Sequence, residues 1–244
     1  MTFMILIILI GLAFILYPRK PKETTKKSDQ KPELNKQWDE TDYAKASGYS
    51  QKDTLSNKGN QGEYLSFQEL KKLEGDHRVL VNLYLPKSNG ETTEIDLLLL
   101  SETGIYVIES KNYSGWIYGD EKNKYWTQVR NSKSKKQFFN PIWQNKTHIK
   151  ALKEVTKIQD DNFYVSYIVF GDTCTLKMVN TTSKDMKLLY LCEVVRELKS
   201  ATANRMKVMT SVQVDELYLK LQAYSRANEE TKNAHIQAII KKVN

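Results

Sequence analysis

The 244-residue sequence is poor in the two side chains that most often build covalent frameworks and zinc centres, with two cysteines and three histidines. Two cysteines cannot form a multiple-disulfide framework, so we expect Cys174 and Cys192 to be buried, reduced thiols. His77, His148 and His235 lack the spacing of zinc ligands, which argues against a zinc site or a histidine-based nuclease. We expect His148 to lie on a helix surface. The sequence also lacks a glycine-rich phosphate loop and internal repeats.

Long runs without charge are absent except at the N-terminus, where residues 1–17 carry no charged side chain. As a helix these residues would span about 25 Å, slightly less than the ~30 Å hydrocarbon core of a bilayer. Basic residues follow the run and none precedes it, unlike the pattern of a cleavable signal peptide. The positive-inside rule then leaves the following chain in the cytoplasm. We expect a single-pass anchor in the cell membrane over residues 1–17, in contact with the lipid bilayer.

Residues 18–60 are polar, mixed in charge and poor in branched apolar side chains. Such a segment cannot bury enough apolar surface to offset the entropy that ordering would cost. We therefore expect a flexible polar linker over residues 18–60. Its basic start could rest on anionic lipid headgroups.

Regular periodicity begins near Gly62 and predicts an α/β domain, for which a content of 40% hydrophobic residues supplies a core. Helices are expected near residues 62–75 and 141–157. Strands are expected over 78–85, 94–100, 105–111 and 163–170, with a hairpin over 115–129 that turns at 120–123. The remaining chain predicts a short strand near 187–191 and helical segments near 192–200, 211–224 and 228–241.

The stretch EIDLLLLSETGIYVIESKN, residues 94–112, is almost entirely apolar yet contains two acids and a lysine near its ends. If residues 101–104 form a four-residue loop, facing residues of the hairpin have numbers that sum to 205. Asp96 then faces Glu109, and Lys111 lies on the same face because side chains repeat every two residues. Gly104 suits a left-handed last loop position. The register therefore predicts that the three charged side chains meet.

Two adjacent carboxylates repel each other unless a cation shares them. Mg²⁺ prefers oxygen ligands and needs only one or two carboxylates, so we expect it here, with Mn²⁺ as a second candidate. The other strand positions are apolar on both faces, which indicates a sheet covered by helices on both sides. The alternative is that Lys111 simply neutralises Glu109 or Asp96 at a half-exposed strand end.

The order of these pieces resembles the PD-(D/E)xK nuclease superfamily, and more closely its nuclease-related domain, NERD. The matching pieces are GE at residues 62–63, EIDLLLL from 94, GIYVIESKNYSG from 104 and NPIWQN from 140. Ile95 replaces the proline that gives the superfamily its name. The resemblance implies a restriction-endonuclease-like α/β core, a mixed sheet flanked by helices, over residues 61–172, with residues 173–244 as an α/β extension packed on it. It also implies metal-dependent cleavage of phosphodiester bonds.

The resemblance assigns roles to five side chains. Asp96 and Glu109 would hold the metal together with the main-chain carbonyl of Ser110, and Lys111 would orient the attacking water and stabilise charge on the phosphate. Glu63 would contribute from its helix and Gln144 from the opposite side. For these two the alternatives remain open: Glu63 as an acid favoured by the helix dipole, and Gln144 as an exposed helix residue.

Charge is concentrated in residues 111–158, which hold eleven Lys or Arg and three acids, so 11 − 3 gives +8, equal to the formal net charge of the whole chain. Eight aromatic residues are interleaved with them. Basic grooves with aromatic platforms bind nucleic acid, although strand aromatics more often pack in a core. The run KSKK at 133–136 is expected in a loop beside the proposed cleft.

Two functional classes follow. The first is a membrane-tethered, Mg²⁺-dependent nuclease that acts on cytoplasmic nucleic acid, with DNA favoured over RNA. The second is a non-catalytic scaffold that keeps the nuclease fold and holds nucleic acid or a protein at the membrane.

Overall fold

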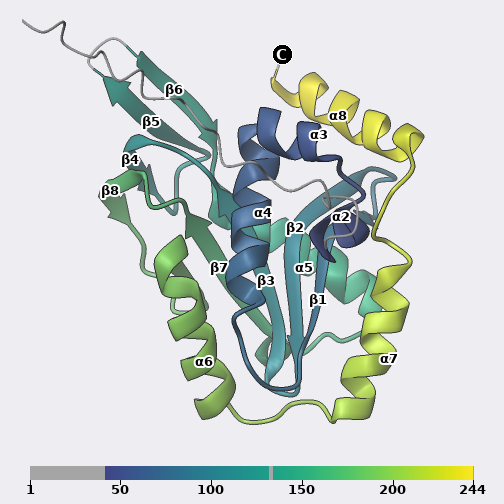
Figure 1. Cartoon of the computed structure of the whole chain (residues 1–244). Coiled ribbons are helices and arrows are strands. Elements are labelled where there is room, and N and C mark those ends of the chain that lie inside the picture. The colour runs from purple at the N-terminus through teal and green to yellow at the C-terminus, as the bar shows by residue number, and fades with distance from the viewer. Residues whose placement is uncertain (1–41, 132–133, 244) are drawn as a thin grey trace, which may run out of the picture. The chain divides into compact units, whose positions relative to one another are not determined.

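The computed structural model describes residues 42–131 and 134–243, and these form an α/β domain with two β-sheets (Figure 1). The predicted anchor over residues 1–17 and the first part of the predicted linker lie outside these ranges. Within the described ranges no helix is both long and apolar enough to cross a membrane.

The first sheet has five strands in the order β1-β2-β3-β7-β9. Strand β2 is antiparallel to both β1 and β3, whereas β7 pairs in parallel with β3, and β9 in parallel with β7, after crossover connections. The sheet is therefore mixed, as predicted. Its strands are β1 (Arg78–Pro86), β2 (Thr92–Ser101), β3 (Gly104–Lys111), β7 (Tyr164–Phe170) and β9 (Met186–Tyr190).

The second sheet has four strands in the order β6-β5-β4-β8. Strand β4 (Gly115–Asp120) pairs with β5 (Tyr125–Asn131) in the predicted hairpin. Strand β8 (Cys174–Asn180) was not predicted; most of its residues are polar or exposed, so the chain shows no clear alternation there. The expected loop at 133–136 is wrong for its described part, because β6 (Ser134–Phe139) pairs with β5 along its whole length.

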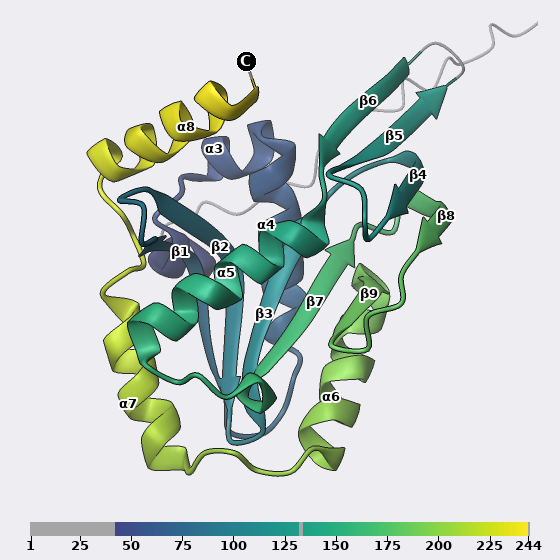
Figure 2. The ribbon, with the colours of Figure 1, turned by 180° about the vertical axis from the view of Figure 1, so that it is seen from behind.

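Helices cover both faces of the first sheet, as the apolar strands require. Helix α4 (Lys58–Leu70) contacts β2 and β3 on one face, and α5 (Pro141–Thr156) crosses the other (Figure 2). On the α5 face, side chains of the sheet pack with Ala151 and Leu152 and with apolar residues of α7 (Ser211–Gln222). The remaining elements are the short helices η2 (Asp161–Phe163) and η3 (Leu191–Glu193), α6 (Val194–Asn204) and α8 (Glu229–Val243).

The predicted linker is wrong for its last part, because residues 42–60 contain helices α2 and α3 and the start of α4. Helix α2 (Asp42–Ser47) buries Tyr43 completely, and its ring packs on Tyr64 and Phe67 of α4. Helix α3 (Gln51–Ser56) starts at Ser50, whose hydroxyl accepts a hydrogen bond from the Asp53 amide. The buried Tyr43 ring and the caps at Ser50 and Asn57, whose side chain accepts from the Gly59 amide, order this polar stretch, and composition does not reveal such contacts.

The two cysteines differ. Cys174 is buried, as expected, and burial raises the pKa of its thiol to about 11. Cys192 is exposed on η3, which corrects the expectation that both thiols are buried.

Candidate active site

The β2–β3 hairpin has the predicted register. Leu100 pairs with Ile105 and Leu97 with Ile108, so facing numbers sum to 205. Gly104 has φ +148°, and a Cβ there would lie 2.9 Å from the carbonyl oxygen of Phe163, so the position requires glycine. The hairpin thus directs the charged ends of both strands to one place.

The pairing becomes irregular at Asp96. The β1–β2 ladder passes from Val81–Leu97 to Leu83–Ile95 and omits the intervening pair, and Asn82 on β1 has φ +52°. Ile95 belongs to the same core cluster as Leu98, although alternation would place these two on opposite faces. Such irregularities re-aim side chains beside functional sites.

Asp96 and Glu109 therefore do not form the direct cross-strand pair that the register predicted. Instead, the Asp96 carboxylate accepts a hydrogen bond of 2.7 Å from the main-chain amide of Ser110. This bond still holds Asp96 against the residue that follows Glu109.

Lys111 joins two other predicted residues. Its ammonium group forms an ion pair with Glu109 and donates a hydrogen bond of 3.3 Å to Oε1 of Gln144 on α5. Glu109 is fully buried, and the Lys111 side chain is 15% exposed. Gln144 thus points from the helix to the strand end, as the resemblance implied, rather than lying free on the helix surface.

Helix α5 is anchored so that this contact can form. The buried Asn140 caps the helix by accepting a hydrogen bond from the Ile142 amide, and it donates to carbonyl oxygens of the β4–β5 turn. The Asn145 amide donates to the Val107 carbonyl and to the Ser166 hydroxyl, both at 2.9 Å. These two buried asparagines set the height and rotation of α5 over β3 and β7.

The prediction for His148 is wrong, because this residue is only 2% exposed and contacts the site. Its Nε2–H donates to Oε2 of Glu109 at 2.9 Å, and its Nδ1 lies 2.9 Å from the Thr93 hydroxyl. The spacing of His148 from Gln144, one helical turn, was the available signal: both residues lie on the same stripe of α5.

Glu63 reaches the same place from α4. Helix α4 approaches β3 closely at Gly62, where a Cβ would lie 2.6 Å from that of Asn112. One turn later, the Ser66 hydroxyl hydrogen-bonds the Ser110 hydroxyl at 3.1 Å. Oε2 of Glu63 is buried without a hydrogen-bond partner among the described residues. The pair GE thus combines a close helix–strand approach with a carboxylate directed inward.

A fourth acid, Glu94, was not predicted as a site residue. It lies two residues before Asp96 on β2, and its carboxylate accepts a hydrogen bond of 2.6 Å from the Tyr84 hydroxyl. Burial raises its pKa, and the charge of Glu109 adds to the effect. Its two-residue offset from Asp96 was the signal that could have found it.

The carboxyl groups differ in charge state. Burial raises the pKa of Glu63 to about 8, with further contributions from Glu94 and Glu109. Burial also raises the pKa of Asp96 well above its ordinary value, and Glu109 and Glu63 add to the shift. Burial alone would raise the pKa of Glu109 too, but Lys111 and His148 hold it below its ordinary value. Thus Glu109 is charged, while Glu63 and Asp96 take up protons readily.

These residues suit a divalent cation chemically. Two carboxyls with raised pKa values and an unpartnered, buried carboxylate oxygen are groups that a cation would stabilise. Asp96, Glu109 and the Ser110 carbonyl, with Glu63, are the groups that could hold Mg²⁺. Even so, within the described ranges no three His, Cys, Asp or Glu side chains already converge as a ready-made metal centre.

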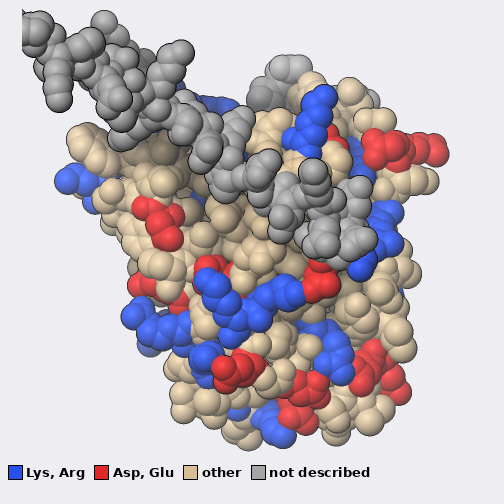
Figure 3. Space-filling view, in the orientation of Figure 1, with Lys and Arg blue, Asp and Glu red and all other residues tan. Residues whose placement is uncertain are grey.

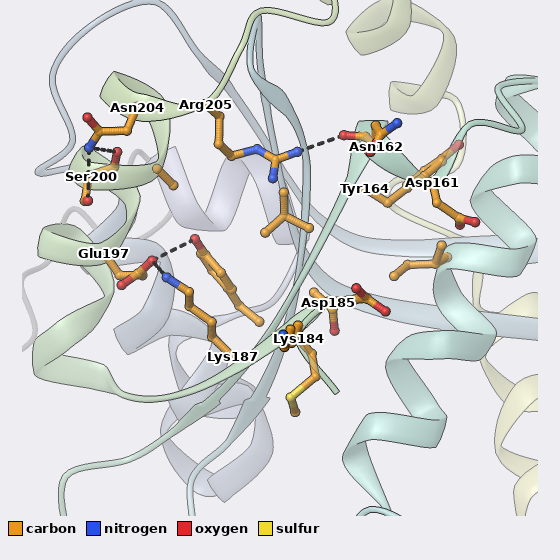
Figure 4. Close-up of a pocket in the computed structure, with 16 residues that line it drawn as sticks. Asp161, Asn162, Tyr164, Lys184, Asp185, Lys187, Glu197, Ser200, Asn204 and Arg205 are labelled. Atoms are coloured by element: carbon orange, nitrogen blue, oxygen red, sulfur yellow. Dashed lines mark hydrogen bonds and ion pairs between the residues drawn. The ribbon is translucent and has the colours of Figure 1, made fainter. Parts of the chain in front are cut away.

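The predicted site lies apart from a cavity of about 680 Å³ that α6, β7 and β9 line (Figure 4). None of the five predicted catalytic residues lines that cavity. Its charged groups are largely paired: Glu197 binds Lys187, and Arg205 donates to the Asn162 carbonyl at 2.8 Å. We therefore base the functional argument on the charged cluster and not on this cavity.

Surface charge on the face that carries α4 and α6 is mixed. Figure 3 shows basic and acidic side chains side by side over the described part of this face, without a patch of one sign. The basic excess of residues 111–158 therefore lies on other surfaces, chiefly α5 and the second sheet, where Lys146, Lys150, Lys124, Lys135 and Lys136 are exposed.

Comparisons with known proteins agree with this arrangement. The family model described as nuclease-related domain, NERD, matches residues 58–171, which run from the start of α4 to the residue after β7. An uncharacterized protein of Bacillus anthracis is 35% identical over 181 residues, covering 74% of this chain and 82% of that protein. No solved structure matches the chain. The chain belongs to the nuclease-related domain (NERD) family.

Proposed function

We propose that this protein is a membrane-tethered, metal-dependent nuclease that cleaves phosphodiester bonds in nucleic acid, with DNA favoured over RNA. One observation carries the proposal: at the end of β3, beside the middle of β2, an ion pair and a hydrogen bond link Glu109, Lys111 and Gln144, and the Ser110 amide between the first two binds Asp96. The charge-free run at residues 1–17 supports the tether and a cytoplasmic position of the domain.

The roles of the side chains follow from their chemistry. Asp96 and Glu109, with the Ser110 carbonyl, would hold Mg²⁺ or Mn²⁺, which would polarise the phosphate and lower the pKa of a bound water. Lys111 carries a positive charge that Glu109 and Asp96 stabilise. Its amine can orient the attacking water and offset negative charge on the phosphate. Gln144 fixes the direction of that amine, because its Oε1 accepts one of the three N–H groups.

A second candidate function is supported by the burial of Glu109. Both of its carboxylate oxygens already have partners, Lys111 and His148, and the side chain is fully buried. A non-catalytic scaffold that binds nucleic acid or a protein at the membrane would keep such a network for stability alone. The two functions differ in whether the cluster takes up a divalent ion.

The test combines cleavage and metal binding in the full chain, purified in a mild detergent. We expect cleavage of plasmid and single-stranded DNA with Mg²⁺ or Mn²⁺, and none with EDTA. The Lys111→Met variant should lose about 100- to 1,000-fold in rate, the range seen when one charge-stabilising donor is removed. Asp96→Asn should abolish cleavage and also weaken Mg²⁺ binding measured by calorimetry.

The control is Lys150→Met, which removes an exposed lysine from α5 and should leave cleavage unchanged. Equal cleavage by the wild type and by both site variants would reject the nuclease. Absence of cleavage and of Mg²⁺ uptake, together with retention of DNA in a gel shift, would favour the scaffold.

A further inference from the structure

The second sheet has one covered and one open face. Ile117, Trp126 and Gln128 point inward and are at most 2% exposed, and the Trp126 ring stacks on Phe170 of the first sheet. Gly119 completes this packing, because a Cβ there would lie 2.2 Å from the Trp126 ring. The alternate positions of the same strands therefore point away from the core.

Aromatic side chains gather on the open side. Pairing places Trp116 beside Val129 and Thr175, Tyr118 beside Met178, and Tyr125 beside Phe139, so these residues share one face. We name it the aromatic face and define it by eight residues. They are Trp116, Tyr118, Lys124, Tyr125, Lys135, Phe139, Lys177 and Met178.

The exposure of these side chains is high for large apolar groups. Trp116 is 50% exposed, Tyr125 and Phe139 are each 40% exposed, and Met178 is 62% exposed. Single exposed apolar residues are common, but several on one sheet face mark an interaction surface. The sequence could not separate these residues from Trp126 and Phe138, which pack inward, because aromatic residues in strands occupy either face.

Lysines accompany the aromatic rings. Strand β8 has one extra residue between the pairs Ile117–Leu176 and Tyr118–Met178, and this residue is Lys177. Its ammonium group lies 5.6 Å from the centre of the Trp116 ring, and that of Lys124 lies 5.2 Å from the Tyr125 ring. None of the ion pairs found in residues 42–131 and 134–243 involves Lys124, Lys135 or Lys177. The two acids at the adjoining β4–β5 turn already have partners. The Asp120 carboxylate accepts a hydrogen bond from the Lys122 amide, and the Glu121 carboxylate accepts from the amides of Thr182 and Ser183.

We propose that the aromatic face binds single-stranded nucleic acid, with bases stacked on Trp116 and its neighbours and phosphates paired with Lys124, Lys135 and Lys177. Bases stack on any aromatic ring, and exposed lysines neutralise the backbone, so rings and ammonium groups together match a single strand. Four-stranded sheets elsewhere hold two or three unpaired bases in this way. A duplex would offer its phosphates to the lysines but not its base faces to the rings.

The position of the face fits the proposed cleavage chemistry, on which this inference rests for its choice of nucleic acid. Strand β4 starts at Gly115, and 115 − 111 places it four residues after Lys111. Four residues span at most about 14 Å. A nucleic-acid strand bound on the aromatic face therefore begins within a few nucleotides of Asp96, Glu109 and Lys111.

The test measures binding without cleavage, by fluorescence anisotropy of a labelled 20-residue oligo(dT) and of a 20-base-pair duplex in EDTA. The protein is the full chain in detergent, with and without Asp96→Asn. Trp116→Ala should weaken oligo(dT) binding about tenfold, the effect of losing roughly one stacked base. Duplex affinity should change less than twofold. Trp116→Phe, which keeps a stacking ring, should bind oligo(dT) within about threefold of the wild type.

Two further variants complete the design. Lys177→Ala should reduce the slope of log affinity against log salt by about 0.7, the value for one phosphate contact on a single strand. Leu219→Ala removes an apolar side chain that is 67% exposed on α7 and should change nothing.

Unchanged oligo(dT) affinity in Trp116→Ala would overturn the proposal, and a simultaneous change of oligomeric state in light scattering would assign the face to self-association instead. The outcome is separable from that of the nuclease. Trp116-dependent binding without any metal-dependent cleavage would keep the aromatic face and reject the nuclease. Metal-dependent cleavage with oligo(dT) binding unchanged in Trp116→Ala would keep the nuclease and reject the aromatic face.

Discussion

The two sheets of this protein differ in which side chains they bury and which they expose. The first sheet is covered by helices on both faces, and the charged residues of β2 and β3 lie in the first half of β2 and at the end of β3. The second sheet is covered on one face only and leaves aromatic residues and lysines on the other. The first sheet therefore buries charged side chains, whereas the second leaves aromatic side chains exposed.

The difference shows how the same alternation serves two purposes. Burial raises the pKa of Asp96 on β2 and of Glu63 on α4, which packs on the first sheet. In the second sheet exposure keeps the rings available for contact with a partner. The two proposals thus place cleavage beside the first sheet and nucleic-acid binding on the second, and the chain passes from one to the other between Lys111 and Gly115.

The largest effect should come from the covered side of the second sheet. Trp126→Ala removes a ring that is 1% exposed and should lower the free energy of unfolding by about 3–5 kcal/mol. Trp116→Ala, on the open face of the neighbouring strand, should cost less than about 1 kcal/mol. Urea unfolding followed by circular dichroism measures both. Equal losses would show that the open face is part of the core and would erase the contrast between the two faces.

A smaller loss of stability is expected from His148→Ala, on helix α5 over the first sheet. The change leaves Oε2 of the buried Glu109 without its donor and the Thr93 hydroxyl without its partner. An unsatisfied buried polar group costs about 1–3 kcal/mol, so the unfolding midpoint in urea should fall accordingly. Lys150→Ala, on the exposed side of the same helix, serves as the control and should be nearly neutral. A loss no greater than in the control would mean that His148 does not support Glu109.

The third expected effect is a pH dependence of stability from Glu63. Its pKa is about 8 in the folded state, above its ordinary value of 4.5, so between these values the folded chain binds more protons than the unfolded chain. The resulting stabilisation is complete below about pH 4.5 and is lost as the pH rises through 8. Glu63→Gln cannot titrate and should lose less stability than the wild type between pH 5.5 and 8.5.

Thermal unfolding in EDTA at both pH values measures this difference. Glu230→Gln, at an exposed position of α8, is the matched control. Parallel stability profiles for the wild type and Glu63→Gln would contradict the raised pKa.

Part of the fold and of the candidate site could be predicted because it depends on local pattern. The register of β2 and β3, in which facing numbers sum to 205, could be predicted from the position of the turn between them, and it brings Asp96 close to Ser110, between Glu109 and Lys111. Pro141 and Asn140 mark the start of α5. The family resemblance added Gln144 and Glu63, and the structure directs both to the strand ends.

Other features could not be predicted because they depend on contacts between distant segments. His148 reaches Glu109 only because α5 lies over β3. Two buried asparagines, Asn140 and Asn145, fix that position of the helix. The helices of residues 42–60 depend on Tyr43 finding Tyr64 and Phe67. The irregular pairing at Asn82 changes the direction of the Asp96 side chain, and no glycine or proline in the sequence indicates this irregularity.

By itself the sequence determined the first sheet and helix α5, the approach of the acids to Lys111, and the membership of the charged residues in a NERD-like pattern, but not strands β6 and β8 or helices α2 and α3. Only the tertiary structure decided which ring of the second sheet is buried and which is open, and which helix residues reach Glu109. The physical reason is that alternation along a strand determines which side chains share a face, whereas the packing of other elements determines which face stays exposed to water.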